Sequence, residues 1–87
     1  MVSRDVVVCN KDGLHSKTAT VFSEKARQYK SMIWVKRQNI EADAKSLLNV
    51  LSLGAFQGTE IRIVAEGPDE NEALESICAF VSNEFSE

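Results

Sequence analysis

"MIWVKRQNIEAD", residues 32–43, contains two short strand-forming runs separated by only two polar residues. The runs are "MIWVKR" at 32–37 and "IEAD" at 40–43, and the Gln-Asn pair between them suits a tight turn. A connection this short joins antiparallel strands, since parallel strands need a crossover of about a dozen residues or more. At least part of the sheet is therefore expected to be antiparallel.

The segment before this hairpin predicts one strand and one helix. The β-branched run "VVVC" predicts a strand over 2–9, and "NKDG" then breaks it with turn-forming residues. A helix is expected from Ser16 to about Gln28, because apolar residues recur there at helical spacing. These residues are Ala19, Phe22 and Ala26.

The segment after the hairpin predicts two helices around a further strand. Ser46 precedes the apolar run "LLNVLSLG", which reads as a short helix ended by Gly54. "EIRIVAE" at 60–66 alternates as a strand does, and a third helix is expected from Asp69 to about Phe85. The apolar stripe of that helix comprises Leu74, Ile77, Cys78, Val81 and Phe85.

The resulting order βαββαβα predicts an α+β open-faced sandwich, in which helices cover one face of a single sheet. Eighty-seven residues make one domain, residues 1–87, because a second hydrophobic core does not fit in this length. Several unrelated functions use this order of elements, so the fold alone does not identify the function.

Composition excludes several classes of protein. The chain is 44% hydrophobic and 26% charged, as in a globular domain, and its net charge of −3 argues against a nucleic-acid binder. No apolar run of about 18 residues predicts a membrane span, and the N-terminus has no signal-peptide pattern. Cys9 and Cys78 match no metal or redox spacing, so both are expected to be free, buried thiols in the cytosol. We expect no cofactor and no metal.

The only histidine, His15, lies in "GLHSKTAT" at 13–20. Gly13 permits an unusual backbone angle, and Ser16 is a good N-cap for the helix, which places His15 just outside the first turn. The first-turn N–H groups lack helical partners and form a ready anion site. They belong to Lys17, Thr18 and Ala19.

A nucleophilic imidazole that carries a phosphoryl group fits this arrangement. The positive end of the helix disfavours the imidazolium, which leaves a neutral nucleophile. We assign the chemistry to His15 and Lys17, and phosphate binding to Ser16, Lys17 and Thr18. The plain alternative is a surface or capping histidine without a role. A histidine metal cluster is excluded for want of a second histidine, and a Ser–His–Asp hydrolase is disfavoured because no nucleophile elbow exists.

The second motif is "KSLLNVLSLG", residues 45–54. A helix this short cannot bury all of its leucines in one direction, so some are expected to form an exposed docking patch. We assign Leu47, Leu48 and Leu51 to that patch, the alternative being that they belong to the core. A phosphate on Ser46 would lie at a favourable helix end and would place about −2 of charge beside the patch.

These two stretches resemble the HPr family, the histidine-containing phosphocarriers of the bacterial sugar phosphotransferase system, and the similarity extends over essentially the whole chain. The resemblance implies a four-stranded antiparallel sheet with three helices. It also implies that His15 accepts a phosphoryl group from enzyme I and passes it to sugar-specific IIA domains. Ser46 matches the serine that HPr kinase/phosphorylase modifies in many Gram-positive members.

The first stretch departs from the family pattern G-[I/L]-H-A-R-P-A at Ser16, Lys17 and Thr18. Lysine lacks the planar fork of arginine, so we expect a slower carrier or a specialised paralogue. The runner-up function is a regulatory HPr-like protein that acts through Ser46 and a catabolite-control transcription factor. A third alternative is an unrelated ferredoxin-like binding module. Its RNA-binding form would need stacking aromatics and its metal-chaperone form a Cys-x-x-Cys loop, and both are absent.

Overall fold

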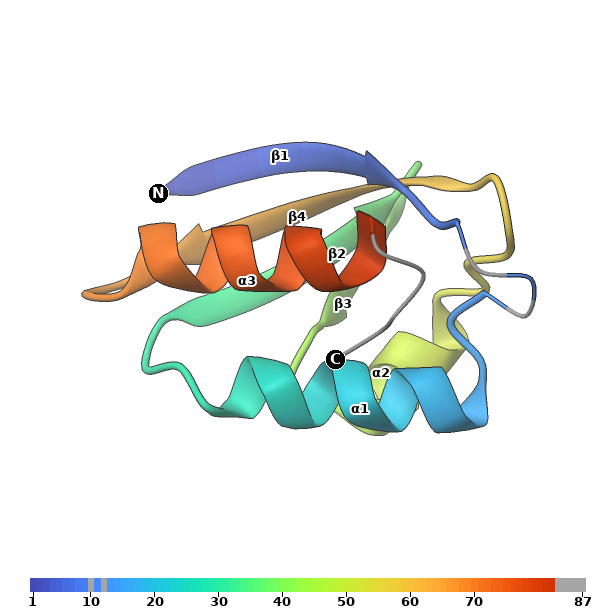
Figure 1. The fold of residues 1–87 in the computed structure, drawn as a ribbon, viewed down its shortest axis with the longest axis horizontal. Helices are drawn as coiled ribbons and strands as arrows, with labels where there is room; N and C mark the ends of the chain where they lie inside the picture. Colours follow the sequence, from blue (N-terminus) through green and yellow to red (C-terminus); the bar gives the residue numbers. More distant parts are fainter. Residues whose placement is uncertain (10, 12, 83–87) are drawn as a thin grey trace.

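The computed structural model describes residues 1–9, 11 and 13–82, and it has the predicted order of elements. Three helices lie on one side of a single sheet, whose other face is open (Figure 1). The strands are β1 (Val2–Val7), β2 (Met32–Arg37), β3 (Ile40–Asp43) and β4 (Glu60–Glu66). The helices are α1 (Ser16–Arg27), α2 (Leu47–Ser52) and α3 (Glu70–Ser82).

The four strands form one antiparallel sheet in the order β1-β4-β2-β3. The predicted β2–β3 hairpin is confirmed: Arg37 pairs with Ile40 across the Gln38–Asn39 turn, where Gln38 has a φ of 54°. The central strand β4 lies between β1 and β2, with Val6 opposite Ile61 and Val35 opposite Ile63. The edge strands are therefore β1 and β3.

The core lies between the inner face of the sheet and the three helices. Alternation along β4 turns Ile61, Ile63 and Ala65 toward the helices, and each is at most 1% exposed. Helix α1 adds Phe22, which is fully buried, and α3 packs along β1 and β4. The α3 stripe is buried as predicted over Leu74, Ile77, Cys78 and Val81, whereas Phe85 lies outside the described residues.

Two expectations near the N-terminus need correction. The first strand ends at Val7 instead of Cys9. The backbone then bends into loop pairing, in which the Val8 N–H donates to the Thr59 carbonyl at 2.9 Å. Cys9 is consequently half-buried rather than buried, and its thiol donates to the Val7 carbonyl at 3.3 Å. Cys78 is buried as expected, and burial raises the pKa of its thiol. Asn10 and Asp12 of the predicted turn lie outside the described residues.

A carboxylate joins the start of α3 to the loop before β2. Asp69 accepts hydrogen bonds from the backbone N–H groups of Lys30 and Ser31, both at 2.9 Å, and from the Ser31 hydroxyl. These bonds favour the ionised form and lower the pKa of Asp69 to about 2. Gly67 allows the close approach, because a Cβ there would lie 2.7 Å from the Ser31 Cα. These hydrogen bonds therefore join the loop that follows α1 to the start of α3.

Candidate functional site

His15 is itself the N-cap of α1, and Ser16 is the first helical residue. The prediction that Ser16 caps the helix is therefore wrong by one position. His15 has an extended backbone, with φ −105° and ψ −179°, and its carbonyl accepts the first helical hydrogen bond, from the Ala19 N–H at 2.6 Å. The imidazole thus lies at the helix mouth and is exposed to solvent.

The hydroxyl of Thr18 explains why the N-cap is His15 instead of Ser16. It accepts a hydrogen bond from the His15 backbone N–H at 3.0 Å and donates to the Gly13 carbonyl at 2.7 Å. A side chain at the third helical position that binds the N-cap N–H is one half of a capping box, and the other half is also present, because the Thr18 backbone N–H faces the His15 side chain. The sequence pattern does not predict this role of Thr18, because the usual residues at that position of a capping box are Glu and Gln.

Gly13 holds the loop before His15 against the segment after α2. Its φ is 66°, and a Cβ on it would lie 2.5 Å from the Ala55 carbonyl oxygen and 2.8 Å from the Phe56 Cα. The Leu14 N–H donates to the same Ala55 carbonyl at 2.9 Å. The predicted need for glycine is therefore confirmed, and the contact that imposes it is a long-range one.

The N–H groups without a helical carbonyl four residues before them are those of Ser16, Lys17 and Thr18, and of these the Thr18 N–H faces the His15 side chain. The predicted set is shifted by one, because the Ala19 N–H already donates to His15. A pocket of about 420 Å³ at this point is lined by His15, Ser16, Lys17 and Thr18. The first turn contains no acidic residue, and the Lys17 side chain is exposed. The site is therefore suited to a dianion such as phosphate.

The second motif forms α2, and Ser46 caps it as predicted. The Ser46 hydroxyl accepts from the Asn49 backbone N–H at 3.3 Å and from the Asn49 side-chain amide at 3.0 Å. Gly54 follows the C-cap in a left-handed conformation with φ 68°. The Arg37 guanidinium donates to the Leu53 carbonyl at 2.7 Å, so this helix end is bonded to β2.

The leucines of α2 divide between core and surface. Leu48 is 75% exposed and Leu51 is 38% exposed, so both can meet a partner. Leu47 is only half-exposed and packs against the core. Val50 and Leu53 are fully buried. The predicted patch is therefore clearest at Leu48 and Leu51, and α2, which carries them, lies beside α1 (Figure 1).

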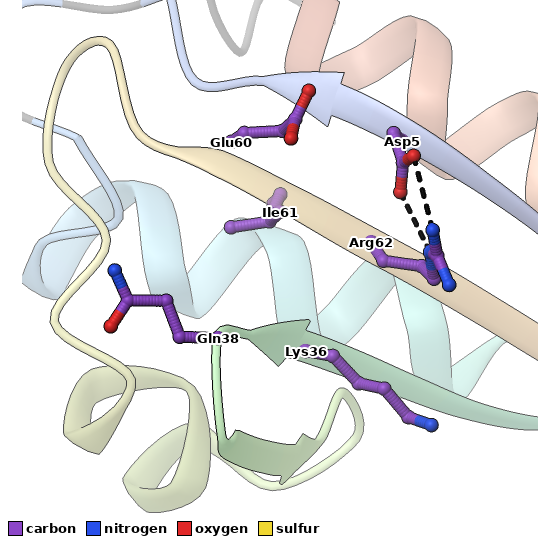
Figure 2. Close-up of a pocket in the computed structure, with 6 residues that line it drawn as sticks. All are labelled: Asp5, Lys36, Gln38, Glu60, Ile61 and Arg62. Atoms are coloured by element: carbon purple, nitrogen blue, oxygen red, sulfur yellow. Dashed lines mark hydrogen bonds and ion pairs between the residues drawn. The ribbon is translucent and has the colours of Figure 1, made fainter.

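A second pocket lies on the open face of the sheet, away from the helices (Figure 2). It has a volume of about 210 Å³ and is lined mainly by polar side chains from three strands and the hairpin turn. Arg62 donates to both carboxylate oxygens of Asp5, at 2.7 and 3.3 Å, and this contact lowers the pKa of Asp5. These two charges form an ion pair across β1 and β4.

Within residues 1–9, 11 and 13–82, no three His, Cys, Asp or Glu side chains are grouped so as to hold a metal ion. None of the helices in the described part of the chain is long and apolar enough to cross a membrane.

Comparison with known proteins points to one family. A sequence model described as "PTS HPr component phosphorylation site" matches residues 2–83. Phosphocarrier protein HPr of Cupriavidus necator is 33% identical over 87 residues, covering 100% of this chain and 98% of that protein. HPr-like protein Crh of Bacillus subtilis is 36% identical over 84 residues, covering 97% and 99% respectively. The crystal structure of HPr-C-His from Thermoanaerobacter tengcongensis superposes with a TM-score of 0.96 at 36% identity, covering 100% of this chain and 98% of that one.

Proposed function

This chain belongs to the HPr family of phosphocarrier proteins, and from that membership we propose that His15 accepts a phosphoryl group from enzyme I and passes it to IIA domains of sugar permeases. The observation that supports the proposal is the exposed imidazole at the mouth of α1, in a pocket it shares with Lys17. The relay would take place in the cytoplasm.

The chemistry needs only parts that the site contains. A ring nitrogen of His15 uses its lone pair to form a bond to phosphorus while the bond between phosphorus and the donor breaks. The first-turn N–H groups of Ser16, Lys17 and Thr18, together with the Lys17 ammonium, then stabilise the phosphoryl oxygens. Transfer to the acceptor repeats the displacement in the opposite sense, so the protein ends unchanged and is a carrier rather than a catalyst.

The test is labelling by purified enzyme I and phosphoenolpyruvate. Wild-type protein should acquire one acid-labile phosphate, and His15→Ala should acquire none. The fold of that variant should survive, because the His15 side chain is exposed. Continued enzyme I-dependent labelling of His15→Ala would falsify the assignment.

Leu47, Leu48 and Leu51 would supply the surface on which enzyme I and the IIA domains dock. Of the three, Leu48 and Leu51 are the more exposed, and α2 lies next to the helix that bears the site. Apolar side chains displayed at one end of a small domain are typical of protein interaction surfaces.

A second, regulatory function would act through Ser46. Its hydroxyl caps α2 by accepting from Asn49, and Ser46 lies two positions from the exposed Leu48. Phosphorylation by HPr kinase/phosphorylase would add a dianion beside the docking leucines and would slow the reaction with an acidic donor. The modified form would then bind a catabolite-control transcription factor. The similarity to Crh favours keeping this function as the alternative to sugar uptake.

The regulatory function has its own test. A cognate kinase with ATP should give an acid-stable phosphate on the wild type and none on Ser46→Ala. Ser46→Asp should be phosphorylated on His15 more slowly than the wild type. Equal rates would argue against the inhibitory role, and no labelling by any cognate kinase would remove the modification itself.

A further inference from the structure

Phe56 is a large aromatic side chain exposed beside the His15 loop. Its side chain is 70% exposed, whereas Phe22 and Phe80 are buried in the core. Isolated exposed apolar residues are common on protein surfaces and need no explanation. Phe56 differs in its position, because its Cα lies against Gly13, two residues before His15.

The turn that carries Phe56 is held rigidly by hydrogen bonds within itself. The Phe56 N–H donates to the Thr59 hydroxyl at 3.1 Å, and the Thr59 N–H donates to the Phe56 carbonyl at 3.0 Å. Gly58, with φ 87°, closes the turn in a conformation that suits glycine. Both polar groups of the Phe56 backbone are therefore bonded within the turn.

The same turn is bonded to the segment that leads to His15. The Gly58 N–H donates to the Val8 carbonyl at 2.8 Å, and the Gln57 side-chain amide donates to the Cys9 carbonyl at 3.2 Å. With the bonds from Leu14 to Ala55 and from Val8 to Thr59, four hydrogen bonds join the turn to the His15 loop. In Figure 1 the loop between α2 and β4 lies beside the start of α1. A protein that reaches the imidazole must also approach this turn.

We propose that Phe56 is a specificity-determining anchor for the protein that phosphorylates His15, and that it inserts into an apolar recess on that donor. This inference rests on the proposed function and adds a residue outside both sequence motifs. Phe56 is exposed, as are Leu48 and Leu51, and it lies in the loop that follows α2 and runs beside the start of α1 (Figure 1). An aromatic side chain has only two χ angles and loses little entropy when it is buried at an interface.

Charge indicates the kind of recess that fits. The net charge of the chain is −3, yet the charged residues that the structure describes within five positions of His15 in the sequence are Lys11 and Lys17, both exposed. A donor surface with an apolar centre and an acidic rim would match both the aromatic ring and these ammonium groups. The ring would supply affinity, and the lysines would steer the approach.

The experiment compares Phe56→Ala with Met32→Ala in phosphorylation by purified enzyme I. Met32 is a matched control, because it is 59% exposed and starts β2, at the opposite end of the molecule from the start of α1 (Figure 1). Truncation of an aromatic anchor should raise the KM for this protein by about tenfold or more and leave kcat at saturation unchanged. Met32→Ala should stay within about twofold of wild type, and Phe56→Tyr should restore most of the lost affinity. The Kd for enzyme I, measured by calorimetry without phosphoenolpyruvate, should follow the KM.

Three outcomes would overturn the anchor role: an unchanged KM and Kd in Phe56→Ala, an equal loss in Met32→Ala, or a fall in kcat with KM unchanged. Failure of the proposed function looks different, since the wild-type protein would then take no label from enzyme I, or His15→Ala would take it. Thermal unfolding of Phe56→Ala should match wild type, because the removed ring is mostly in solvent.

Discussion

The hydroxyl of Thr18 donates a hydrogen bond to the carbonyl of Gly13 at 2.7 Å. This bond joins the first turn of α1 to the loop that precedes His15, and the same oxygen accepts the His15 N–H. The pattern typical of the family has proline at this position, and proline has no hydroxyl to offer. This chain therefore holds the loop before His15 with a side-chain hydrogen bond that the proline of that pattern could not make.

Thr18→Val tests that bond, because valine keeps the branched shape and removes the hydroxyl. We expect a loss of about 1 kcal/mol in stability, typical of a lost helix cap, and a slower phosphorylation of His15. Thr18→Ser should retain most of both properties. Thermal unfolding and the initial rate with enzyme I measure the two effects. A valine variant with wild-type stability and rate would show that the hydroxyl is dispensable.

Lys17→Arg should be a faster carrier than the wild type. A guanidinium can meet two phosphoryl oxygens at once, and a contact worth about 1 kcal/mol in the transition state corresponds to roughly fivefold in rate. The matched control is Lys30→Arg, an exposed lysine beyond the other end of α1. Both substitutions leave the net charge unaltered, and the phosphorylation rates are compared at equal ionic strength so that charge screening is the same. An equal or slower Lys17→Arg variant would indicate that the lysine is adapted to other partners.

Leu48→Asp should weaken the binding of enzyme I without lowering stability, because Leu48 is 75% exposed. Val50→Ala should leave the binding of enzyme I unchanged and should lower stability by about 2 kcal/mol, because Val50 is fully buried in the same helix. Leu47 separates the two effects less cleanly, since it is half-exposed and packs against the core. Calorimetric binding and denaturant unfolding of both variants provide the measurement. Loss of stability in Leu48→Asp would place that leucine in the core.

Gly13→Ala should be much more damaging than Gly58→Ala. Both glycines have positive φ, so each substitution brings a strain cost of about 1–2 kcal/mol. Only at Gly13 would the new Cβ also meet backbone, 2.5 Å from the Ala55 oxygen, whereas nothing lies within 4 Å at Gly58. The first variant should therefore lose stability and His15 phosphorylation together. Similar losses in the two variants would mean that backbone strain, rather than the contact with the turn, requires glycine at 13.

Asp69 should make the stability of the fold depend on pH at acidic values. Its pKa is lowered to about 2 in the folded protein, below an unfolded value of about 3.9. The stabilisation is therefore complete above about pH 4 and is lost as the pH falls toward 2. Asp69→Asn should lack this part of the pH dependence, while Glu75→Gln, an exposed control on α3, should retain it. Denaturant unfolding between pH 2 and pH 6 measures the difference. Parallel curves for wild type and Asp69→Asn would contradict the assignment.

Features that depend on neighbouring residues were readable from the sequence. The hairpin at 32–43, the cap at Ser46 and the buried stripe of α3 all follow from local periodicity and turn chemistry. His15 could be placed at a helix start for the same reason, although its exact capping position could not. The N-cap is His15 instead of Ser16 because the Thr18 hydroxyl accepts the His15 N–H. A pattern of residue types does not reveal this hydrogen bond.

Features that depend on residues far apart in the chain were decided by the tertiary structure. The strand order β1-β4-β2-β3 brings the 55–59 turn against the loop before His15, and no local pattern encodes that meeting. The same holds for Phe56, whose significance comes from its contact with Gly13, and for the leucines of α2, whose exposure depends on how the helix lies against α1. The sequence determined which elements form and where the histidine lies, because those depend on the chain within a few residues. The fold alone determined which side chains surround it, because long-range packing chooses one face of each element to bury.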